Sequence, residues 1–362
     1  MKKENQIKKE FFAAANSGKG FVSFYSQIFE DKNIKRRYLI KGGPGTGKST
    51  FMKALAESAQ KSGLEVECFR CSSDPSSLDA VIIAGRVAVI DATSPHSVEG
   101  EYVGARDEII NLGEFWNSDA LGEKLEEIRN LSDAKKSCYA RAYRFLDAAM
   151  QVDEVCRAFG RERLDRAKMA KAVKRLLKNV SDENGFELKT RLCDSIGMSG
   201  RVRLDGYERS ATEVYVINDE YKLGSTFLAM LVEAARDKKC AVSISYDPIN
   251  LDYPDALLFE NSGVAFVLGD GAENDGNECL YINMKRFVKK IGENATTKKE
   301  YRYYSRMFDG LVQAAQDELA KAGAAHFALE ELYKGNMDFA SQSEFLSDIS
   351  KKIIGAGKQK EV

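Results

Sequence analysis

The feature that most constrains this chain is that it contains the same pattern twice. A short apolar segment, a loop and a stretch opening with Ser-Thr-Phe occur at residues 38–52 and again at residues 215–228. Asp74 and Asp247, each followed by proline, extend the match along both copies. Self-similarity at a near-constant offset indicates a duplicated structural unit. The sequence therefore predicts two copies of one α/β unit.

The second part of each copy is helical. An apolar stripe with 4-3-4-3 spacing, typical of one helix face, recurs at the corresponding place in the second copy. The stripe comprises Cys138, Ala142, Phe145, Ala149, Val152 and Cys156, then Ala315, Leu319, Ala322, His326, Leu329 and Tyr333. All five prolines lie outside residues 101–215 and 255–362. We expect a helical hairpin in each copy, with the stripe, including His326, buried within its own unit rather than exposed to a partner.

The boundary between the copies is predicted from a polar, glycine-containing stretch at residues 181–185, which suits a linker. A chain of 362 residues also exceeds what one hydrophobic core usually serves. The prediction is two tandem domains, residues 1–184 and 185–362, each with a helical hairpin appendage.

Residues 42–50, GGPGTGKST, satisfy the G-x4-G-K-[ST] pattern of a phosphate-binding loop. The loop lies between an apolar strand and an amphipathic helix, which is the context the pattern requires. Its glycines let successive backbone N–H groups converge on an anion, Lys48 would meet the β- and γ-phosphates, and Ser49 would bind Mg²⁺. The predicted nucleotide-binding residues are Gly42, Gly43, Pro44, Gly45, Thr46, Gly47, Lys48, Ser49 and Thr50.

The predicted partner of this loop is Asp91, which ends the apolar strand 87–91. A carboxylate at a strand's carboxyl end is placed to hold Mg²⁺ together with Ser49, so Lys48 and Asp91 are the candidate catalytic pair. The alternative is that Asp91 only caps the following turn. Ala92, not glutamate, follows Asp91, which favours slow hydrolysis, another base or an acceptor other than water.

Three further features have alternative interpretations. His96 could contact the γ-phosphate or could be a surface histidine. Asp74 could bind substrate or position water, or could simply initiate a turn before proline. Cys68 and Cys71 form a C-x-x-C pair, but no second pair completes a zinc site and no redox context surrounds them, so we assign them neither function.

The second copy has lost the residues of this site. Its loop, 218–226, is one residue shorter and carries Asp219 and Glu220 where the first copy has glycines. Lys222 lies too early in the loop to replace the missing lysine, and Leu268 occupies the position of the metal-binding aspartate. Carboxylates repel phosphates. The sequence predicts a degenerate pseudo-domain and one nucleotide per chain.

Charge and composition exclude several classes of protein. Lys and Arg number 54 against 55 Asp and Glu, so there is no overall basic excess typical of nucleic-acid binding. No apolar run approaches the roughly 20 residues of a membrane span, and no signal-peptide core follows the charged start. Seven scattered cysteines suit reduced thiols. We expect a cytoplasmic protein without membrane contact and without clear nucleic-acid binding.

Four segments together resemble a family of bacterial tandem P-loop proteins described only as ATP-binding proteins or ATPases. The segments are GGPGTGKST at 42–50, CSSDPSSLD at 71–79, VAVIDATSPH at 87–96 and DEIINLGEFW at 107–116. The resemblance covers nearly the whole chain and implies a P-loop fold and nucleotide binding, but no substrate. Both copies in that family often carry an intact loop, whereas here the second does not.

The combined prediction is a P-loop NTPase, an enzyme that binds ATP or GTP with Mg²⁺ and hydrolyses it slowly, coupled to a conformational change. One alternative is a small-molecule or nucleotide kinase, in which Arg161, Arg163 and Arg166 would form a lid over the phosphates. Another is a non-catalytic nucleotide-dependent switch. A protein partner is compatible with all three but is not identified by the sequence.

Overall fold

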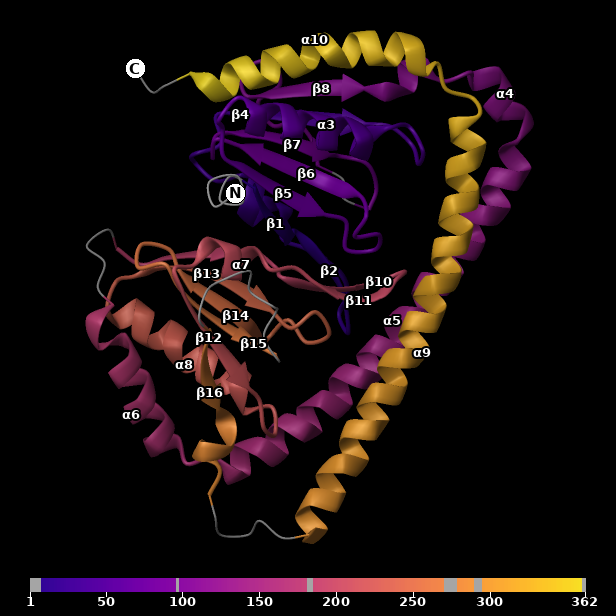
Figure 1. Cartoon of the computed structure of the whole chain (residues 1–362). Helices are drawn as coiled ribbons and strands as arrows, with labels where there is room; N and C mark the ends of the chain where they lie inside the picture. The colour runs from indigo at the N-terminus through magenta and orange to yellow at the C-terminus, as the bar shows by residue number, and fades with distance from the viewer. Residues whose placement is uncertain (1–7, 96–97, 181–184, 270–278, 290–294, 360–362) are drawn as a thin grey trace.

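The computed structural model describes residues 8–95, 98–180, 185–269, 279–289 and 295–359. The chain is an α/β protein with two mixed six-stranded sheets, one from each half, and helices around them (Figure 1). Among the described helices, none is long and apolar enough to cross a membrane.

The two sheets have the same strand order. The first sheet is ordered β1-β5-β6-β7-β4-β8, with strands β1 (Lys8–Phe12), β4 (Arg36–Lys41), β5 (Val66–Arg70), β6 (Leu78–Ile83), β7 (Val87–Asp91) and β8 (Asp107–Asn111). The second is ordered β9-β13-β14-β15-β12-β16, with strands β9 (Glu187–Thr190), β12 (Glu213–Asn218), β13 (Ala241–Tyr246), β14 (Pro254–Phe259), β15 (Val264–Leu268) and β16 (Cys279–Asn283). The pairing of β5 with β6 shifts register between Phe69 and Arg70, and the pairing of β13 with β14 shifts at the corresponding place, between Ser245 and Tyr246. The structure is thus consistent with the predicted duplication.

Each half also sends a hairpin to the other half. The hairpins are β2–β3 (Ala14–Ser17 and Gly20–Ser23), followed by α2 (Tyr25–Phe29), and β10–β11 (Asp194–Gly197 and Gly200–Arg203), followed by α7 (Gly206–Ser210). The backbone N–H of Gly18 donates to the carbonyl of Ile249 at 2.9 Å, and that of Met198 donates to the carbonyl of Ser73 at 2.8 Å. Each hairpin therefore packs against the half of the chain to which it does not belong.

The helices follow the same repeated order. The first half has α3 (Lys48–Lys61), η1 (Leu112–Phe115), α4 (Ser118–Glu123), α5 (Leu125–Arg163), α6 (Arg166–Leu176) and η2 (Leu177–Asn179). The second half has α8 (Leu223–Asp237), η3 (Met284–Phe287), α9 (Ala295–Lys334) and α10 (Phe339–Lys358). At 1.5 Å per residue, a helix of 39 residues such as α5 is about 58 Å long, roughly twice the diameter of a small domain.

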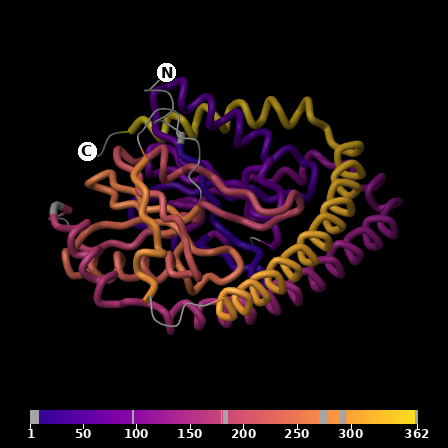
Figure 2. Tube along the Cα trace, turned by 60° about the horizontal axis from the view of Figure 1, so that its bottom comes forward, coloured from indigo at the N-terminus to yellow at the C-terminus, as the bar shows by residue number. Residues whose placement is uncertain are grey.

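The long helices α5 and α9 pack against each other in opposite directions, as both overall views show (Figure 1 and Figure 2). Arg141 Nε donates to Glu318 Oε2 at 2.6 Å, and these residues are 177 apart, which is the offset between the two apolar stripes. Corresponding positions of the two copies therefore meet at a pseudo-twofold axis, as in an isologous interface.

This pairing corrects the prediction of a helical hairpin within each copy. Helix α6 of the first half packs on α8 of the second, and α10 of the second half packs on α3 of the first. A helix as long as α5 cannot be covered by its own sheet, so its apolar face is buried by the other copy. The stripe itself is buried largely as expected, except that Leu146 rather than Phe145 faces the interior, because a 3.6-residue period brings either position to that face.

The hydrophobic cores reflect the same exchange. One core lies between the two sheets and combines apolar residues of both halves, such as Phe69 and Tyr207. The outer core of the first sheet includes Leu346 of α10, and that of the second sheet includes Met169 of α6. The predicted domain boundary adjoins residues 181–184, which lie outside the described residues.

Candidate functional site

The glycine-rich loop connects β4 to α3, with Lys48 as the first helical residue. Gly45 and Gly47 have φ angles of 69° and 81°, in the left-handed region that favours glycine. The N–H of Phe51 donates to the carbonyl of Gly47 at 2.9 Å and closes the first helical turn. Because the first amides of a helix have no partner within the helix, this turn presents backbone donors beside the loop.

Lys48 and Asp91, the predicted catalytic pair, lie together. Lys48 Nζ is 3.6 Å from Asp91 Oδ2 and donates to the carbonyls of Gly42 and Gly43 at 2.9 and 2.6 Å. The N–H of Thr93 donates to Asp91 Oδ1 at 3.0 Å. Burial raises the pKa of Asp91, and the nearby Lys48 opposes that shift. The strand end and the helix start thus bring one cation and one carboxylate to the same point.

The oxygen donors near this point suit a hydrated Mg²⁺ ion. Ser49 Oγ accepts from the N–H of Leu78 at 3.0 Å, which leaves its hydroxyl a further lone pair, and Asp91 contributes a carboxylate. Among the described residues no group of three or more His, Cys, Asp or Glu side chains could hold a metal. Mg²⁺ commonly takes only one or two protein ligands and completes its shell with water and phosphate. The donor set therefore fits Mg²⁺.

A cavity of about 760 Å³ opens over the loop. It is lined by loop residues 44–50, by the turn after β5, by Asp91, and by side chains of α3, α5, α9 and α10. The helix residues beyond the loop that line it are Lys53, Lys135, Lys136, Tyr139, Tyr143, His326, Glu330, Lys334 and Phe339. Sequence reasoning missed this helical wall, and it placed His326 in the core, whereas the His326 side chain borders the cavity.

The far end of the second half covers the loop. A Cβ atom on Gly45 would lie 2.5 Å from the carbonyl oxygen of Glu330, and one on Gly43 would lie 3.2 Å from the ring of Tyr333. Gln342 Nε2, on α10, donates to the carbonyl of Thr46 at 2.7 Å. The loop of the first copy is therefore completed by the end of α9 and the start of α10, from the second copy.

The other candidates have separate positions. Asp74 accepts from the hydroxyls of Ser76 and Ser77, both at 2.7 Å, so it organises its own turn while also lining the cavity. Cys71 lines the cavity too, and burial raises its thiol pKa well above the usual value. His96 lies outside the described residues.

The predicted arginine lid does not form over this loop. Arg161 donates to the hydroxyl of Tyr253 in the second half, and Arg166 begins α6, which packs on the second half. The kinase alternative placed these arginines over the phosphates at the first loop. The length of α5 carries them to the other end of the molecule.

The loop of the second copy contains an internal anion. Asp219 Oδ1 accepts from the N–H of Gly224 at 2.7 Å and from that of Glu220 at 2.8 Å. Burial raises the pKa of Asp219, and these amides oppose the shift. Leu268, at the strand end, leaves no room over Gly224, where a Cβ atom would lie 2.3 Å from Leu268 Cδ2.

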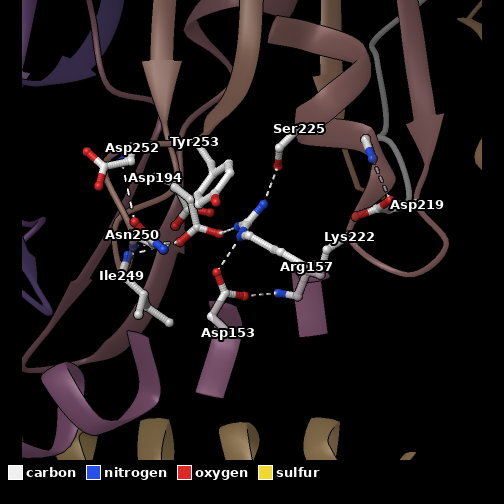
Figure 3. A network of polar contacts seen from close by, with 12 residues as sticks. Asp153, Arg157, Asp194, Asp219, Lys222, Ser225, Ile249, Asn250, Asp252 and Tyr253 are labelled. Carbon is white, nitrogen blue, oxygen red and sulfur yellow. Dashed lines mark hydrogen bonds and ion pairs between the residues drawn. The ribbon is translucent and has the colours of Figure 1, made fainter. Parts of the chain in front are cut away.

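An arginine from the first half lies on the second loop (Figure 3). Arg157, on α5, donates to Ser225 Oγ at 2.9 Å, pairs with Asp153, and lies 3.4 Å from Asp247 Oδ2. Lys222 Nζ is 3.2 Å from Asp153 Oδ1, so the loop lysine points to this carboxylate. Only 3% of the Arg157 side chain is exposed. The second loop is thus filled by charged groups of the chain itself.

Comparison with protein-family models, with curated proteins and with solved structures finds no match for this chain. The internal repeat is therefore the comparison that the chain provides. At the offset of 177 residues that separates Arg141 from Glu318, Lys334 corresponds to Arg157 and Glu330 corresponds to Asp153. Once Arg157 and Asp153 are placed at the second loop, that offset identifies Lys334 and Glu330 as the corresponding residues at the first loop.

Proposed function

We propose that the chain binds ATP or GTP with Mg²⁺ at residues 42–50 and Asp91, in a P-loop fold, and hydrolyses the nucleotide slowly with an accompanying conformational change. The observation that carries this proposal is the meeting of Lys48 Nζ and Asp91 Oδ2 at 3.6 Å beside a left-handed glycine loop and a helix start. The cavity above them falls within the usual range for a small-molecule site.

Each residue has a chemical part in this proposal. The loop amides and the positive end of α3 would bind the phosphates, and Lys48 would exchange the loop carbonyls for the β- and γ-phosphates. Ser49 and Asp91 would hold Mg²⁺, which neutralises charge on the transferred phosphoryl group. The residue after Asp91 is the buried Ala92, which has no group to activate water, and this favours slow turnover.

The test is calorimetric titration of the full chain with non-hydrolysable ATP and GTP analogues and Mg²⁺. We expect one nucleotide per chain, and at least about tenfold weaker binding in Lys48→Ala, because a charged hydrogen bond to phosphate is lost. Lys61→Ala, an exposed lysine at the other end of α3, is the matched control and should bind normally. Two nucleotides per chain, or unchanged affinity in Lys48→Ala, would contradict the proposal.

Phosphate release measured on the same protein separates the activities. Slow release with water as acceptor supports a hydrolase. A kinase would instead form the nucleoside diphosphate without free phosphate, and only when a small-molecule acceptor is present to take the phosphoryl group. Tight binding without turnover would identify a switch.

A further inference from the structure

The filled loop of the second half provides a template for the cavity of the first. In the second half, the end of α5 places Arg157 Nη1 2.9 Å from the hydroxyl of Ser225. Ser225 corresponds to Ser49, since both precede Thr-Phe at the start of the helix that follows the loop. The residue that corresponds to Arg157, at the offset shared by Arg141 and Glu318, is Lys334 at the end of α9. The template therefore directs attention to Lys334.

We propose that Lys334 contacts the phosphate chain of the nucleotide bound at the first loop, so that the ligand is held between the two halves. This inference rests on the nucleotide binding proposed above. Lys334 would act from the side opposite Lys48: one lysine comes from the loop of the first half and the other from the helix of the second. The proposal adds a ligand-contacting residue that the loop motif does not contain.

The position of Lys334 supports this contact. Its Cγ atom lies 3.1 Å from the place where a Cβ atom on Gly45 would be, so the stem of the side chain passes directly over the loop. Lys334 also lines the cavity together with Lys48. The same approach of helix to loop occurs in the second half, where a Cβ atom on Gly160 would lie 2.0 Å from the carbonyl of Tyr221.

The ammonium group of Lys334 can change partners. It is paired with Glu331 at 2.9 Å and with Glu330 at 3.5 Å, and 44% of its side chain is exposed. Exposed pairs of this kind contribute little to stability, so exchange of a glutamate for a phosphate oxygen is not opposed by the fold. Arg157, in contrast, is held by buried carboxylates. The first site thus retains an exchangeable cation where the second has a fixed one.

The charged side chains of the cavity wall include a slight excess of lysines over carboxylates. The lysines are Lys48, Lys53, Lys135, Lys136 and Lys334, and the carboxylates are Asp74, Asp79, Asp91 and Glu330. A ligand with several negative charges could be contacted by lysines of α5, of α9 and of the loop at the same time. Nucleotide binding would then stabilise the contact between the end of α9 and the sheet of the first half. This contact would connect the ligand with the conformational change proposed above.

The experiment measures the affinity of a non-hydrolysable ATP analogue with Mg²⁺ for the full chain and four variants. We expect Lys334→Gln to bind roughly 10- to 100-fold more weakly, because a charge-assisted hydrogen bond is lost. Lys334→Arg should bind within about threefold of the unchanged protein, since arginine keeps the charge and the donors and is the residue found at the second loop. Thermal unfolding of each variant monitors the fold.

Two controls make the outcome unambiguous. Lys321→Gln removes an exposed lysine from the same helix that pairs with Glu318 away from the cavity, and it should bind normally. Lys48→Ala tests the loop itself. If Lys48→Ala loses nucleotide binding while Lys334→Gln does not, the proposal that Lys334 contacts the phosphates is wrong and the proposed function stands. Loss in both Lys334→Gln and Lys334→Arg would indicate a packing role and would also overturn the contact. If the unchanged protein binds no nucleotide, the proposed function fails, and this inference with it.

Discussion

The two loops differ in the groups that contact their backbone amides and their first helical turn. The first loop borders a cavity of about 760 Å³, and its lysine donates to two loop carbonyls. The second loop has an internal carboxylate, Asp219, on its amides and an internal cation, Arg157, over its serine. Each loop connects corresponding elements, β4 to α3 in the first half and β12 to α8 in the second, and the two sheets have the same strand order. The same place in the fold thus borders a cavity in one half and is occupied by charged groups of the chain itself in the other.

The two loops also differ in how strongly their ion pairs should contribute to stability. At the second loop, Arg157 faces the buried carboxylates of Asp153 and Asp247, so removal of one partner leaves the other charge uncompensated in a low dielectric. At the first loop, Lys334 is partly exposed and its ion pairs can be replaced. Substitutions at corresponding positions should therefore affect stability in one half and ligand affinity in the other.

The largest expected effect is on Arg157. Arg157→Ala should lower the free energy of unfolding by about 3–5 kcal/mol, because Asp153 and Asp247 lose a buried partner. Lys222 remains beside Asp153, so the lower end of this range is expected. Denaturant unfolding measures the change, and Arg161→Ala, whose side chain is 48% exposed, should shift it by no more than about 1 kcal/mol. A loss under about 1 kcal/mol for Arg157→Ala would show that the network does not stabilise the second half.

The second prediction concerns pH and the carboxyl of Asp255, near this network. Burial raises its pKa from 3.8 to about 6, although Arg203 opposes the shift. The folded state then binds the proton more tightly than the unfolded state, so the stabilisation is complete below about pH 3.8 and is lost as pH rises through about 6. Between about pH 4 and 7 the free energy of unfolding of the unchanged protein should fall by at most about 3 kcal/mol relative to that of Asp255→Asn, whose side chain does not titrate there.

Denaturant unfolding at several pH values measures this difference. Asp252→Asn, a change at a carboxylate that is 65% exposed and pairs with Lys19, is the matched control and should keep the pH dependence of the unchanged protein. Parallel pH profiles for the unchanged protein and Asp255→Asn would contradict the prediction.

The third prediction uses the strand end that carries Asp91 in the first half and Leu268 in the second. Asp91→Asn should reduce the gain in nucleotide affinity that Mg²⁺ provides by about tenfold, since a carboxylate that holds a metal through water commonly has an effect of that size. Affinity without Mg²⁺ should change little. Titrations with Mg²⁺ and with a chelator compare the two proteins. An unchanged metal dependence would place the metal carboxylate elsewhere, and Asp74 would be the next residue to test.

The smallest effect is expected at Lys334, the counterpart of Arg157. Lys334→Ala should change the free energy of unfolding of the ligand-free protein by less than about 1 kcal/mol, because its ion pairs are exposed. Unfolding measured beside Arg157→Ala provides the direct contrast. A loss as large as that of Arg157→Ala would show that the two positions do the same structural work.

The sequence allowed the architecture of each half to be predicted but not the exchange between them. Strand, loop and helix patterns are local, so the repeat at residues 38–52 and 215–228 predicted the duplicated α/β unit, which the two sheets support. Which sheet α6 and α10 cover depends on the direction of α5 and α9, and an apolar stripe does not specify which copy buries it. Only the length of the helices indicated that they leave their own half.

For the site, the same distinction holds. Lys48 begins α3 and Asp91 ends β7, as the local pattern predicted, because a strand followed by a glycine-rich loop and a helix is specified by adjacent residues. Glu330, Lys334 and Gln342 belong to the other copy of the repeat and reach the loop only through the exchanged helices. The lid arginines were misplaced for the same reason. Long-range contacts of this kind follow from topology, which no short motif contains.

The contact between Arg141 and Glu318 bears on how the chain assembles. Because these positions correspond, two copies of the first half joined in the same way would set Arg141 against Arg141, and two copies of the second half would set Glu318 against Glu318. Like charges at such a point repel, whereas the mixed pair attracts. This pair therefore favours contact between the two different halves over contact between two like halves.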